Sequence, residues 1–243
     1  MSEFLEKWSR EDLLDSVDEF NKLYESRPIK DNNGGMKSAH MFSAWFVVKQ
    51  MKPIYLIESG VWKGLGTWFF EKASPETKII SIDPQPGFRV YDSPISTYQT
   101  EDFLKTDWSH LPKEDTLIFF DDHQNFLERM KHANNIGFKK IMTEDNYPYH
   151  QGDCYTPKKI LSNRKYVIDN AGHRVWYDKN DNDLKYFIEN VSIYQEMPPL
   201  FKGTTTRWGD NWDSKYPTPK ELLTINDIEK YPKFYEEKED YTW

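Results

Sequence analysis

The sequence predicts one α/β domain with a mostly parallel central sheet and helices on both of its faces. Three observations carry this prediction. Short apolar runs alternate with helical patterns, the runs are continuously apolar, and 243 residues suit a single domain with some extension. Continuous apolar runs are typical of parallel strands, which are buried on both faces. We expect such strands at residues 54–57, 78–82, 116–120 and 140–142.

Two helices are expected before the first strand, over residues 9–51. Ser9 is a candidate N-cap with Asp12 as its capping partner. Apolar residues then recur at helical spacing from Leu13 to Tyr24, and the helix should end before Pro28. After a turn at residues 31–35, a second helix is predicted from Ser38 to about residue 51.

The predicted core occupies residues 54–200 and the predicted extension residues 204–243. Helices are expected at residues 67–73 and 126–136, the second ending at Gly137. Further strands are expected at residues 173–177 and 191–195. In the extension, Thr218 and Pro219 are typical of a helix start and predict a helix to about Tyr231. No internal repeat or linker divides the chain, so residues 1–243 are interpreted as a single domain.

Composition narrows the classes of function. The net charge is −8 and no Lys/Arg-rich stripe is present, so nucleic acid is not an expected partner. No apolar run approaches the roughly 20 residues that span a bilayer, so a membrane is not expected either. Cys154 is the single cysteine, which excludes an internal disulfide. Together these features favour a protein of the reducing cytoplasm.

Acidic residues mark the ends of all four predicted strands. In open α/β sheets, ligands bind at the carboxyl ends of the strands. Four acidic ends at one edge therefore predict a site that holds hydroxyls, amines or a metal. These residues are Glu58, Asp83, the pair Asp121 and Asp122, and the pair Glu144 and Asp145.

A glycine-containing turn follows the first strand, with the spacing Glu-x-Gly-x-x-x-Gly-x-Gly from Glu58 to Gly66. Gly60 allows a tight bend, whereas Gly64 and Gly66 let the backbone approach a ligand closely. The next helix presents free amides at its start. Asp83, at the end of the second strand, can accept both hydroxyls of a ribose.

This combination resembles the class I S-adenosylmethionine-dependent methyltransferases. The stretch ESGVWKG, residues 58–64, is similar to the macrocin O-methyltransferase and cephalosporin hydroxylase-like branch. The resemblance covers roughly residues 54 to 150 and implies a Rossmann-like class I methyltransferase fold. It further implies that Glu58, Gly60, Gly64 and Asp83 line the S-adenosylmethionine pocket, with Asp102 toward the adenine. Gly34 and Gly35 would either close over the cofactor or form a plain turn.

The doublets after the third and fourth strands offer carboxylate and amide oxygens around one point. Such ligands suit Mg²⁺, and a nearby imidazole would admit Mn²⁺. The pattern resembles the metal site of catechol-type O-methyltransferases, which implies Asp122, Asp145 and Asn146 as ligands. Asp121 and Glu144 are the competing choices, and N-capping of the following helices is the structural alternative. The lysine base of the catechol enzymes is replaced here by Asn125.

The expected activity is metal-assisted O-methylation. His123 is the first choice as general base and His150 the second, although a lone histidine also suits a structural role. Because macrocin-type enzymes act on sugars, the acceptor is expected to be a sugar, glycan or related polyhydroxylated small molecule. The loop 147–155 is either an acceptor wall or a loop packed by its own tyrosines, and Trp208, Asp210 and Trp212 would form a second wall.

Two alternatives remain. One is an enzyme of the same fold with other chemistry, such as a hydroxylase-like relative, and the other is a non-catalytic nucleotide-binding or scaffold protein. A homodimer is compatible with the expected function, because symmetric dimers are the commonest oligomers.

Overall fold

The computed structural model describes residues 4–149, 151–168, 174–178, 181–205 and 218–240. Its centre is a five-stranded parallel sheet in the order β3-β2-β1-β4-β5. This is the strand order of a Rossmann-like fold, so the predicted fold class is confirmed. The strands are β1 (Tyr55–Ser59), β2 (Lys78–Ile82), β3 (Ser96–Gln99), β4 (Thr116–Phe120) and β5 (Lys140–Thr143).

Strand β3 is absent from the sequence prediction. Its four residues, Ser96 to Gln99, are polar or half-buried and carry no apolar run. It lies at one edge of the sheet, where a strand needs no apolar side chains on both faces. The apolar signal used for the other four strands therefore could not find it.

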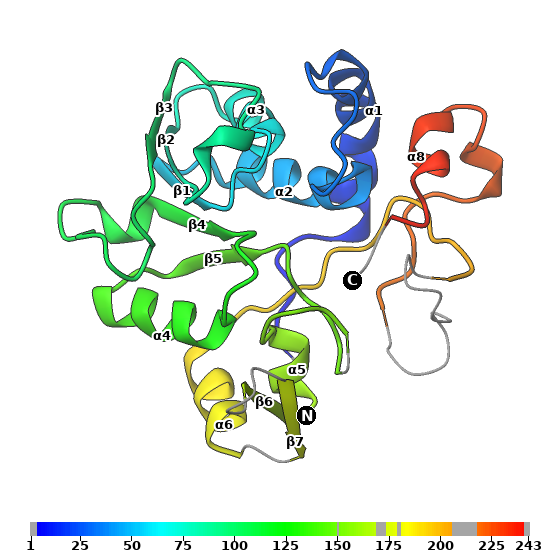
Figure 1. Cartoon of the computed structure of the whole chain (residues 1–243). Coiled ribbons are helices and arrows are strands. Elements are labelled where there is room, and N and C mark those ends of the chain that lie inside the picture. The colour runs from blue at the N-terminus through cyan, green and yellow to red at the C-terminus, as the bar shows by residue number, and fades with distance from the viewer. Residues whose placement is uncertain (1–3, 150, 169–173, 179–180, 206–217, 241–243) are drawn as a thin grey trace.

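Helices cover both faces of the sheet (Figure 1). One face carries α1 (Arg10–Ser26), α2 (Ser38–Met51) and α3 (Leu65–Ala73), and the other carries α4 (Phe126–Ile136). Successive strand residues point to opposite faces, so Leu117 packs under the N-terminal helices while Ile118 packs against α4. Hydrophobic cores thus lie on both sides of the sheet.

Local signals set the helix ends as predicted in two places. The Ser9 amide donates to Asp12 Oδ2 at 2.8 Å and the Asp12 amide donates to Ser9 Oγ at 3.2 Å, which completes the capping box of α1. Gly137 ends α4 in the left-handed conformation, with φ of 103°. Helix α3 begins at Leu65, before the predicted Thr67, because Gly64 is its N-cap.

Beyond the sheet, the chain forms smaller units. Helix α5 (Pro157–Leu161) precedes a two-stranded antiparallel sheet of β6 (Arg164–Ile168) and β7 (Arg174–Asp178), and α6 (Asp181–Asn190) follows. Strand β7 confirms the strand predicted there, except that His173 lies outside the described residues. The strand predicted at 191–195 is wrong, because only Ile193 forms a bridge, with Leu5.

The helix predicted at 219–231 is also wrong. Instead, Thr224 and Asp227 form a capping box that starts the short 3-10 helix Ile225–Asp227, and α8 (Pro232–Glu236) begins anew. Pro232 cannot donate a backbone hydrogen bond, so it suits only a helix start. Thr218 caps nothing, since its hydroxyl oxygen is buried without a hydrogen-bond partner among the described residues. Two further 3-10 turns span Pro86–Phe88 and Lys113–Asp115.

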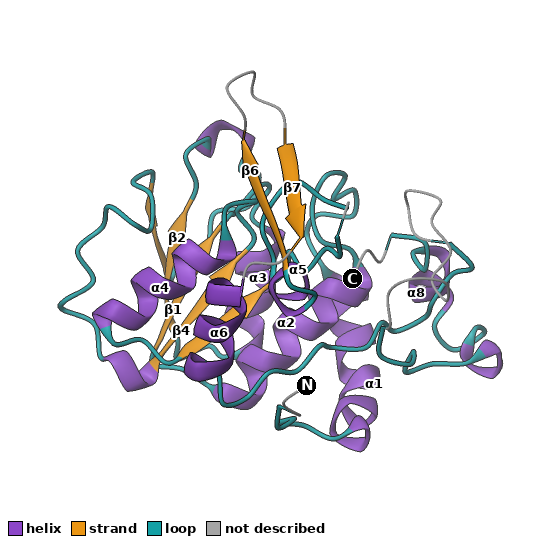
Figure 2. Cartoon of the chain, turned by 90° about the horizontal axis from the view of Figure 1, so that it is seen from below, coloured by secondary structure: helices purple, strands orange, loops and turns teal. Residues whose placement is uncertain are grey.

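The C-terminal segment packs on the N-terminal helices, beside α1 and α2 (Figures 1 and 2). The Phe234 ring stacks on Phe20 with 5.6 Å between centroids. Glu237 accepts hydrogen bonds from the Tyr24 hydroxyl at 2.7 Å and from the Ser38 amide at 2.9 Å. Within the described part of the chain, no helix has both the length and the apolar character that crossing a bilayer requires.

Candidate functional site

A cavity of about 250 Å³ opens at the carboxyl ends of β1, β2 and β4. It is where open α/β sheets bind their ligands. Its wall includes the turn at residues 34–35, the glycine turn at residues 59–62 and the acidic segment at residues 121–124. Of the residues predicted from sequence, it brings together Gly60, Asp83, Asp102, Asp122 and His123.

Gly60 and Gly64 are required by the packing of the protein itself. Gly60 has φ of 98°, and a Cβ atom there would lie 1.9 Å from the carbonyl oxygen of Asp121. Gly64 has φ of 87°, and its Cβ would lie 2.4 Å from the carbonyl oxygen of Tyr91. Only glycine adopts these conformations at no steric cost. Gly60 therefore lets the turn bring the end of β1 close to the end of β4. Gly64 does not line the cavity.

Asp83 lies beside the glycine turn, as predicted, and its carboxylate also orders that turn. Oδ2 accepts hydrogen bonds from the amides of Val61 at 3.2 Å and Trp62 at 2.9 Å, and Oδ1 accepts one from the Gln85 amide at 2.7 Å. The side chain is half-buried at the cavity wall. A carboxylate in this position remains able to accept further hydroxyl donors from a ligand.

Trp62 is a cavity residue that sequence reasoning missed. It has φ of 50°, an unusual conformation for a bulky residue, and such residues concentrate at ligand sites. Its indole Nε1 donates to the Asn33 carbonyl oxygen at 2.9 Å. This contact holds the turn at Gly34 and Gly35 against the cavity. Gly34 and Gly35 thus form part of the wall. The position of Trp62 inside the ESGVWKG stretch was the available signal for this residue.

Glu58 lies within β1 and is 1 % exposed. Its carboxylate accepts hydrogen bonds from the hydroxyls of Thr67 at 2.6 Å and Ser81 at 2.7 Å, which fasten α3 and β2 to β1. Burial raises the pKa of Glu58 to about 7. Glu58 is not among the residues that line the cavity, so in this arrangement it supports the turn from within the sheet.

Arg129, on α4, joins two of the predicted acidic residues. Its guanidinium donates two hydrogen bonds of 2.7 Å to the Asp102 carboxylate and lies 2.9 Å from Asp122 Oδ2. Asp122 also accepts a hydrogen bond from Ser59 Oγ at 2.7 Å. Arg129 holds the pKa of Asp102 below its ordinary value. Sequence reasoning missed Arg129, because a charged residue inside a helical pattern usually faces solvent.

A group of potential metal ligands is formed by Asp121, His123 and Asp145, whose ligand atoms all lie within 4.8 Å of one another. Asp145 is 4 % exposed, and its Oδ2 accepts a hydrogen bond from the His123 amide at 3.1 Å. Its Oδ1 is buried, lies 3.5 Å from His123 Nδ1 and accepts no hydrogen bond from the described residues. A buried carboxylate oxygen without a donor is costly, and a divalent cation would satisfy it. The residues therefore fit a metal.

The predicted ligands are thus brought together only in part. Asp145 belongs to the group together with Asp121, the competing choice, whereas the Asp122 carboxylate lies outside it and faces Arg129. Asn146 accepts a hydrogen bond from the Lys158 amide at 2.9 Å and donates one to the Tyr194 hydroxyl at 3.1 Å, so both ends of its amide are engaged elsewhere.

The pKa values of the three residues in this group are all raised above their ordinary values. Burial, followed by the charge of Glu144, raises the pKa of Asp145 to about 7 and that of Asp121 well above its usual value. His123 Nδ1 lies 2.8 Å from Asp153 Oδ1, and this interaction raises the pKa of His123 to about 9. The imidazole therefore carries a proton at neutral pH when no cation is bound.

The loop after β5 is packed by its own tyrosines. Tyr147 and Tyr155 are 3 % and 2 % exposed, and neither ring lines the cavity. The pKa of the buried Cys154 thiol is raised, mainly by desolvation, so the thiol stays protonated, as expected for an inert cysteine. His150 and the predicted second wall of Trp208, Asp210 and Trp212 lie outside the described residues.

No protein-family model and no curated protein matches the sequence. Solved structures with a similar fold include one described as cmcI-N160 with SAH, which is 17 % identical, with a TM-score of 0.39 over 50 % of this chain and 68 % of that chain. The SAH-bound Podospora anserina methyltransferase PaMTH1 is 16 % identical, with a TM-score of 0.37 over 54 % and 62 %. The O-methyltransferase TomG from Streptomyces achromogenes in complex with SAM is 11 % identical, with a TM-score of 0.36 over 54 % and 62 %.

These similarities concern roughly half of the chain, and in PaMTH1 and TomG they span less than two thirds of the neighbour's own length. The neighbours include O-methyltransferases. At these identities the similarity concerns the fold alone. What the chain shares with these structures is a region of Rossmann-like α/β fold.

Proposed function

We propose that this chain is an S-adenosylmethionine-dependent, metal-assisted O-methyltransferase that acts on a hydroxyl of a sugar, glycan or related polyhydroxylated small molecule. One observation carries the proposal. A single cavity joins the glycine turn, the Asp83 carboxylate and the acidic segment after β4, of which Asp121 belongs to the candidate metal group. Cofactor, metal and acceptor would therefore meet at one edge of the sheet. The choice of a sugar acceptor rests on the resemblance to macrocin-type enzymes.

The charge of the cavity favours a cationic ligand. Asp83, Asp102, Asp121 and Asp122 line it beside two basic side chains, His123 and Arg129. The guanidinium of Arg129 is bound by Asp102 and Asp122, and burial raises the pKa of Asp121, so the Asp83 carboxylate supplies the negative charge that remains available to a ligand. Fixed negative charge attracts a sulfonium and repels the pyrophosphate of a dinucleotide. S-adenosylmethionine combines a sulfonium with a ribose, for which Asp83 supplies the acceptor oxygens. The cavity thus suits this cofactor better than a phosphate-bearing nucleotide.

Asp121 and Asp145 would hold the divalent cation, which when bound would act as a Lewis acid toward the acceptor hydroxyl, and the lone pair of His123 would be kept for the proton of that hydroxyl. His123 is our candidate base, because it is the described imidazole that lines the cavity. It can accept a proton only when neutral. Its pKa falls when positive charge beside it compensates the carboxylates of Asp145 and Asp153, which now raise it.

In the proposed reaction the acceptor hydroxyl gives its proton to the base while its oxygen attacks the methyl carbon. An oxygen–carbon bond forms, the sulfur–carbon bond breaks, and S-adenosylhomocysteine leaves with the sulfur electron pair. The protein contributes mainly by holding the two reactants in line, which removes much of the entropic part of the barrier.

The test is calorimetric titration of S-adenosylmethionine and S-adenosylhomocysteine into the protein, with and without Mg²⁺ or Mn²⁺. We expect micromolar binding that is lost in Asp83→Ala and weakened in Asp83→Asn, which retains an acceptor for the amides of Val61 and Trp62. Asp92→Ala is the matched control, since this exposed carboxylate does not line the cavity. Absence of binding by either ligand under every metal condition would refute the proposal.

A further inference from the structure

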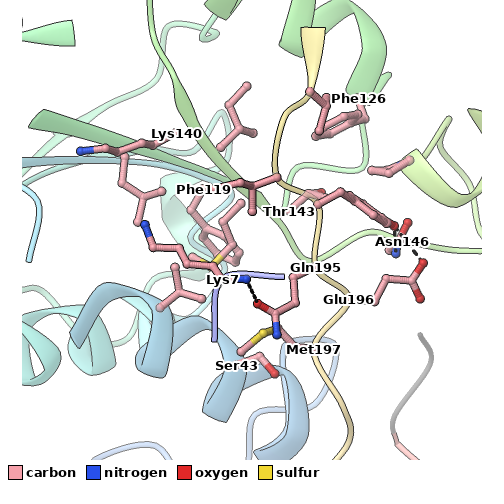
Figure 3. Close-up of a pocket in the computed structure, with 18 of the residues that line it drawn as sticks. Lys7, Ser43, Phe119, Phe126, Lys140, Thr143, Asn146, Gln195, Glu196 and Met197 are labelled. Carbon is pink, nitrogen blue, oxygen red and sulfur yellow. Dashed lines mark hydrogen bonds between the residues drawn. The ribbon is translucent and has the colours of Figure 1, made fainter. Parts of the chain in front are cut away.

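A second cavity, of about 360 Å³, lies beside β5. Its walls come from α2, from β5, and from the segment 191–197, with Lys7 and Trp8 of the N-terminal segment. Figure 3 shows Asn146 and Glu196 at one end of it, Lys7 and Lys140 at the other, and Thr143 between them. Pockets of this size hold small organic ligands.

The wall of this cavity is unusually rich in thioethers. Five of the seven methionines of the chain line it, together with apolar residues such as Val47 and Phe119. The methionines are Met36, Met51, Met130, Met142 and Met197. Methionine side chains are unbranched, flexible and polarisable, so they form apolar surfaces that adapt to the shape of a ligand. The chemistry of the wall therefore favours an apolar ligand body.

The two cavities share no lining residue, but their walls come close together at the turn that precedes α2 and at the acidic residues that follow β5. Gly34 and Gly35 line the cofactor cavity, and the next residue, Met36, lines the second one. His123, whose amide donates to Asp145, lines the cofactor cavity, and Glu144, which precedes Asp145, lines the second one. Asp145, between Glu144 and Asn146, belongs to the candidate metal group. Two lining residues of the second cavity, Glu144 and Asn146, are therefore the chain neighbours of a residue of the candidate metal group.

The side of the cavity nearest this group is polar. His40, on α2, places Nδ1 2.7 Å from Glu144 Oε1, and the two side chains are 10 % and 11 % exposed. Ser43, one helical turn after His40, adds a hydroxyl. Polar groups beside the candidate metal group and the apolar side chains of the methionine wall match a ligand with a hydroxylated head and an apolar body.

We propose that the second cavity binds the apolar body of the acceptor, so that the acceptor is an amphiphilic hydroxyl compound, such as a glycoside with an aliphatic or aromatic substituent. The inference rests on the proposed function and narrows its acceptor class. A bare sugar would leave the methionine wall in contact with water. An apolar substituent removes that area from water, and this stabilises the complex in proportion to the area buried.

The probes are n-octyl β-D-glucoside below its critical micelle concentration and methyl β-D-glucoside, which share the sugar and differ in the apolar chain. Each is titrated calorimetrically into the full chain in the presence of S-adenosylhomocysteine. We expect the octyl compound to bind at least tenfold more tightly. With carbon-13-labelled methionine methyls, the resonances of Met142 and Met197 should shift, whereas that of Met41, which is fully buried and does not line the cavity, should not.

Two variants place the binding in the cavity. Ser43→Phe puts a ring into it and Met197→Gln makes its wall polar, and each should reduce octyl glucoside affinity at least tenfold. Ser26→Phe makes the same substitution as Ser43→Phe, but at an exposed position of α1, and should leave the octyl glucoside affinity unchanged. Circular dichroism shows whether each variant is folded. If Ser43→Phe does not fold, the test depends on Met197→Gln.

Equal binding of the two glucosides, or undiminished octyl glucoside binding by the folded cavity variants, would overturn the inference. Titration of S-adenosylhomocysteine alone separates this outcome from failure of the proposed function. If S-adenosylhomocysteine binds while the two glucosides bind equally, only the acceptor inference fails. If S-adenosylhomocysteine does not bind, the proposed function fails whatever the glucosides do.

Discussion

Replacing Asp145 by Asn should stabilise the protein at alkaline pH in the absence of metal. Asp145 is 4 % exposed, and one of its carboxylate oxygens has no hydrogen-bond partner among the described residues. Burial and the neighbouring Glu144 raise its pKa from the ordinary 3.8 to about 7. The folded protein therefore binds a proton that the unfolded chain has already released. In this pH range the free energy of unfolding must fall as the pH rises.

The size of the effect follows from the pKa. Each tenfold change in acidity corresponds to about 1.4 kcal/mol, so ionising Asp145 costs the folded state about 4 kcal/mol once the pH exceeds about 7. Asparagine avoids this cost but loses the attraction to protonated His123 and adds an amide that needs an acceptor. We expect a net gain of about 2 kcal/mol, which raises the melting temperature of a chain of this length by about 4–8 °C.

Thermal unfolding followed by circular dichroism, in a chelator at about pH 5 and about pH 8, measures this prediction. The variant should match the parent at the lower pH and exceed it at the higher one. Added Mg²⁺ should stabilise the parent protein and not the variant. Asp15→Asn, at an exposed position of α1, is the control for loss of a carboxylate. A variant that is no more stable than the parent at about pH 8 would refute the reasoning.

Three further changes test the frame around the site. Gly60→Ala should lower the free energy of unfolding by more than about 3 kcal/mol, because the new Cβ would lie 1.9 Å from the Asp121 carbonyl oxygen. Urea unfolding measures this change, and near-normal stability would contradict the prediction. Ser9→Ala removes the N-cap of α1 and should cost about 1 kcal/mol, measured by thermal unfolding; an unchanged melting temperature would show that the cap does not contribute. Glu237→Ala leaves the buried Tyr24 hydroxyl without its acceptor, which should cost about 1–3 kcal/mol and release the C-terminal segment to limited proteolysis. An unchanged cleavage pattern would contradict this role.

Much of the fold was predictable because its signals are local. The capping box at Ser9, the C-terminal Gly137 and the apolar strand runs each depend on residues close in sequence, and each is found in the structure. The errors occur where local signals compete or are missing. The predicted helix at 219–231 is interrupted by the Thr224 capping box and by Pro232, and the polar strand β3 is formed by its pairing with β2.

The candidate site was predictable only in part for the same reason. The acidic strand ends and the glycine turn are visible in the sequence, and the strand order brings most of them to one cavity. Which doublet residue faces the metal group depends on side-chain partners far away in the chain. Arg129 takes the Asp122 carboxylate, so Asp121 joins His123 and Asp145.

By itself, the sequence determined the class of fold, the position of the glycine turn and the edge of the sheet where the candidate site lies. These follow from hydrophobic periodicity, glycine conformation and the direction of parallel strands, which are short-range properties. Only the tertiary structure decided that Glu58 is buried behind the cavity, that Trp62 holds the turn at residues 34–35, and that a methionine-lined cavity lies beside β5. Such features depend on contacts between distant segments, and no local pattern encodes them.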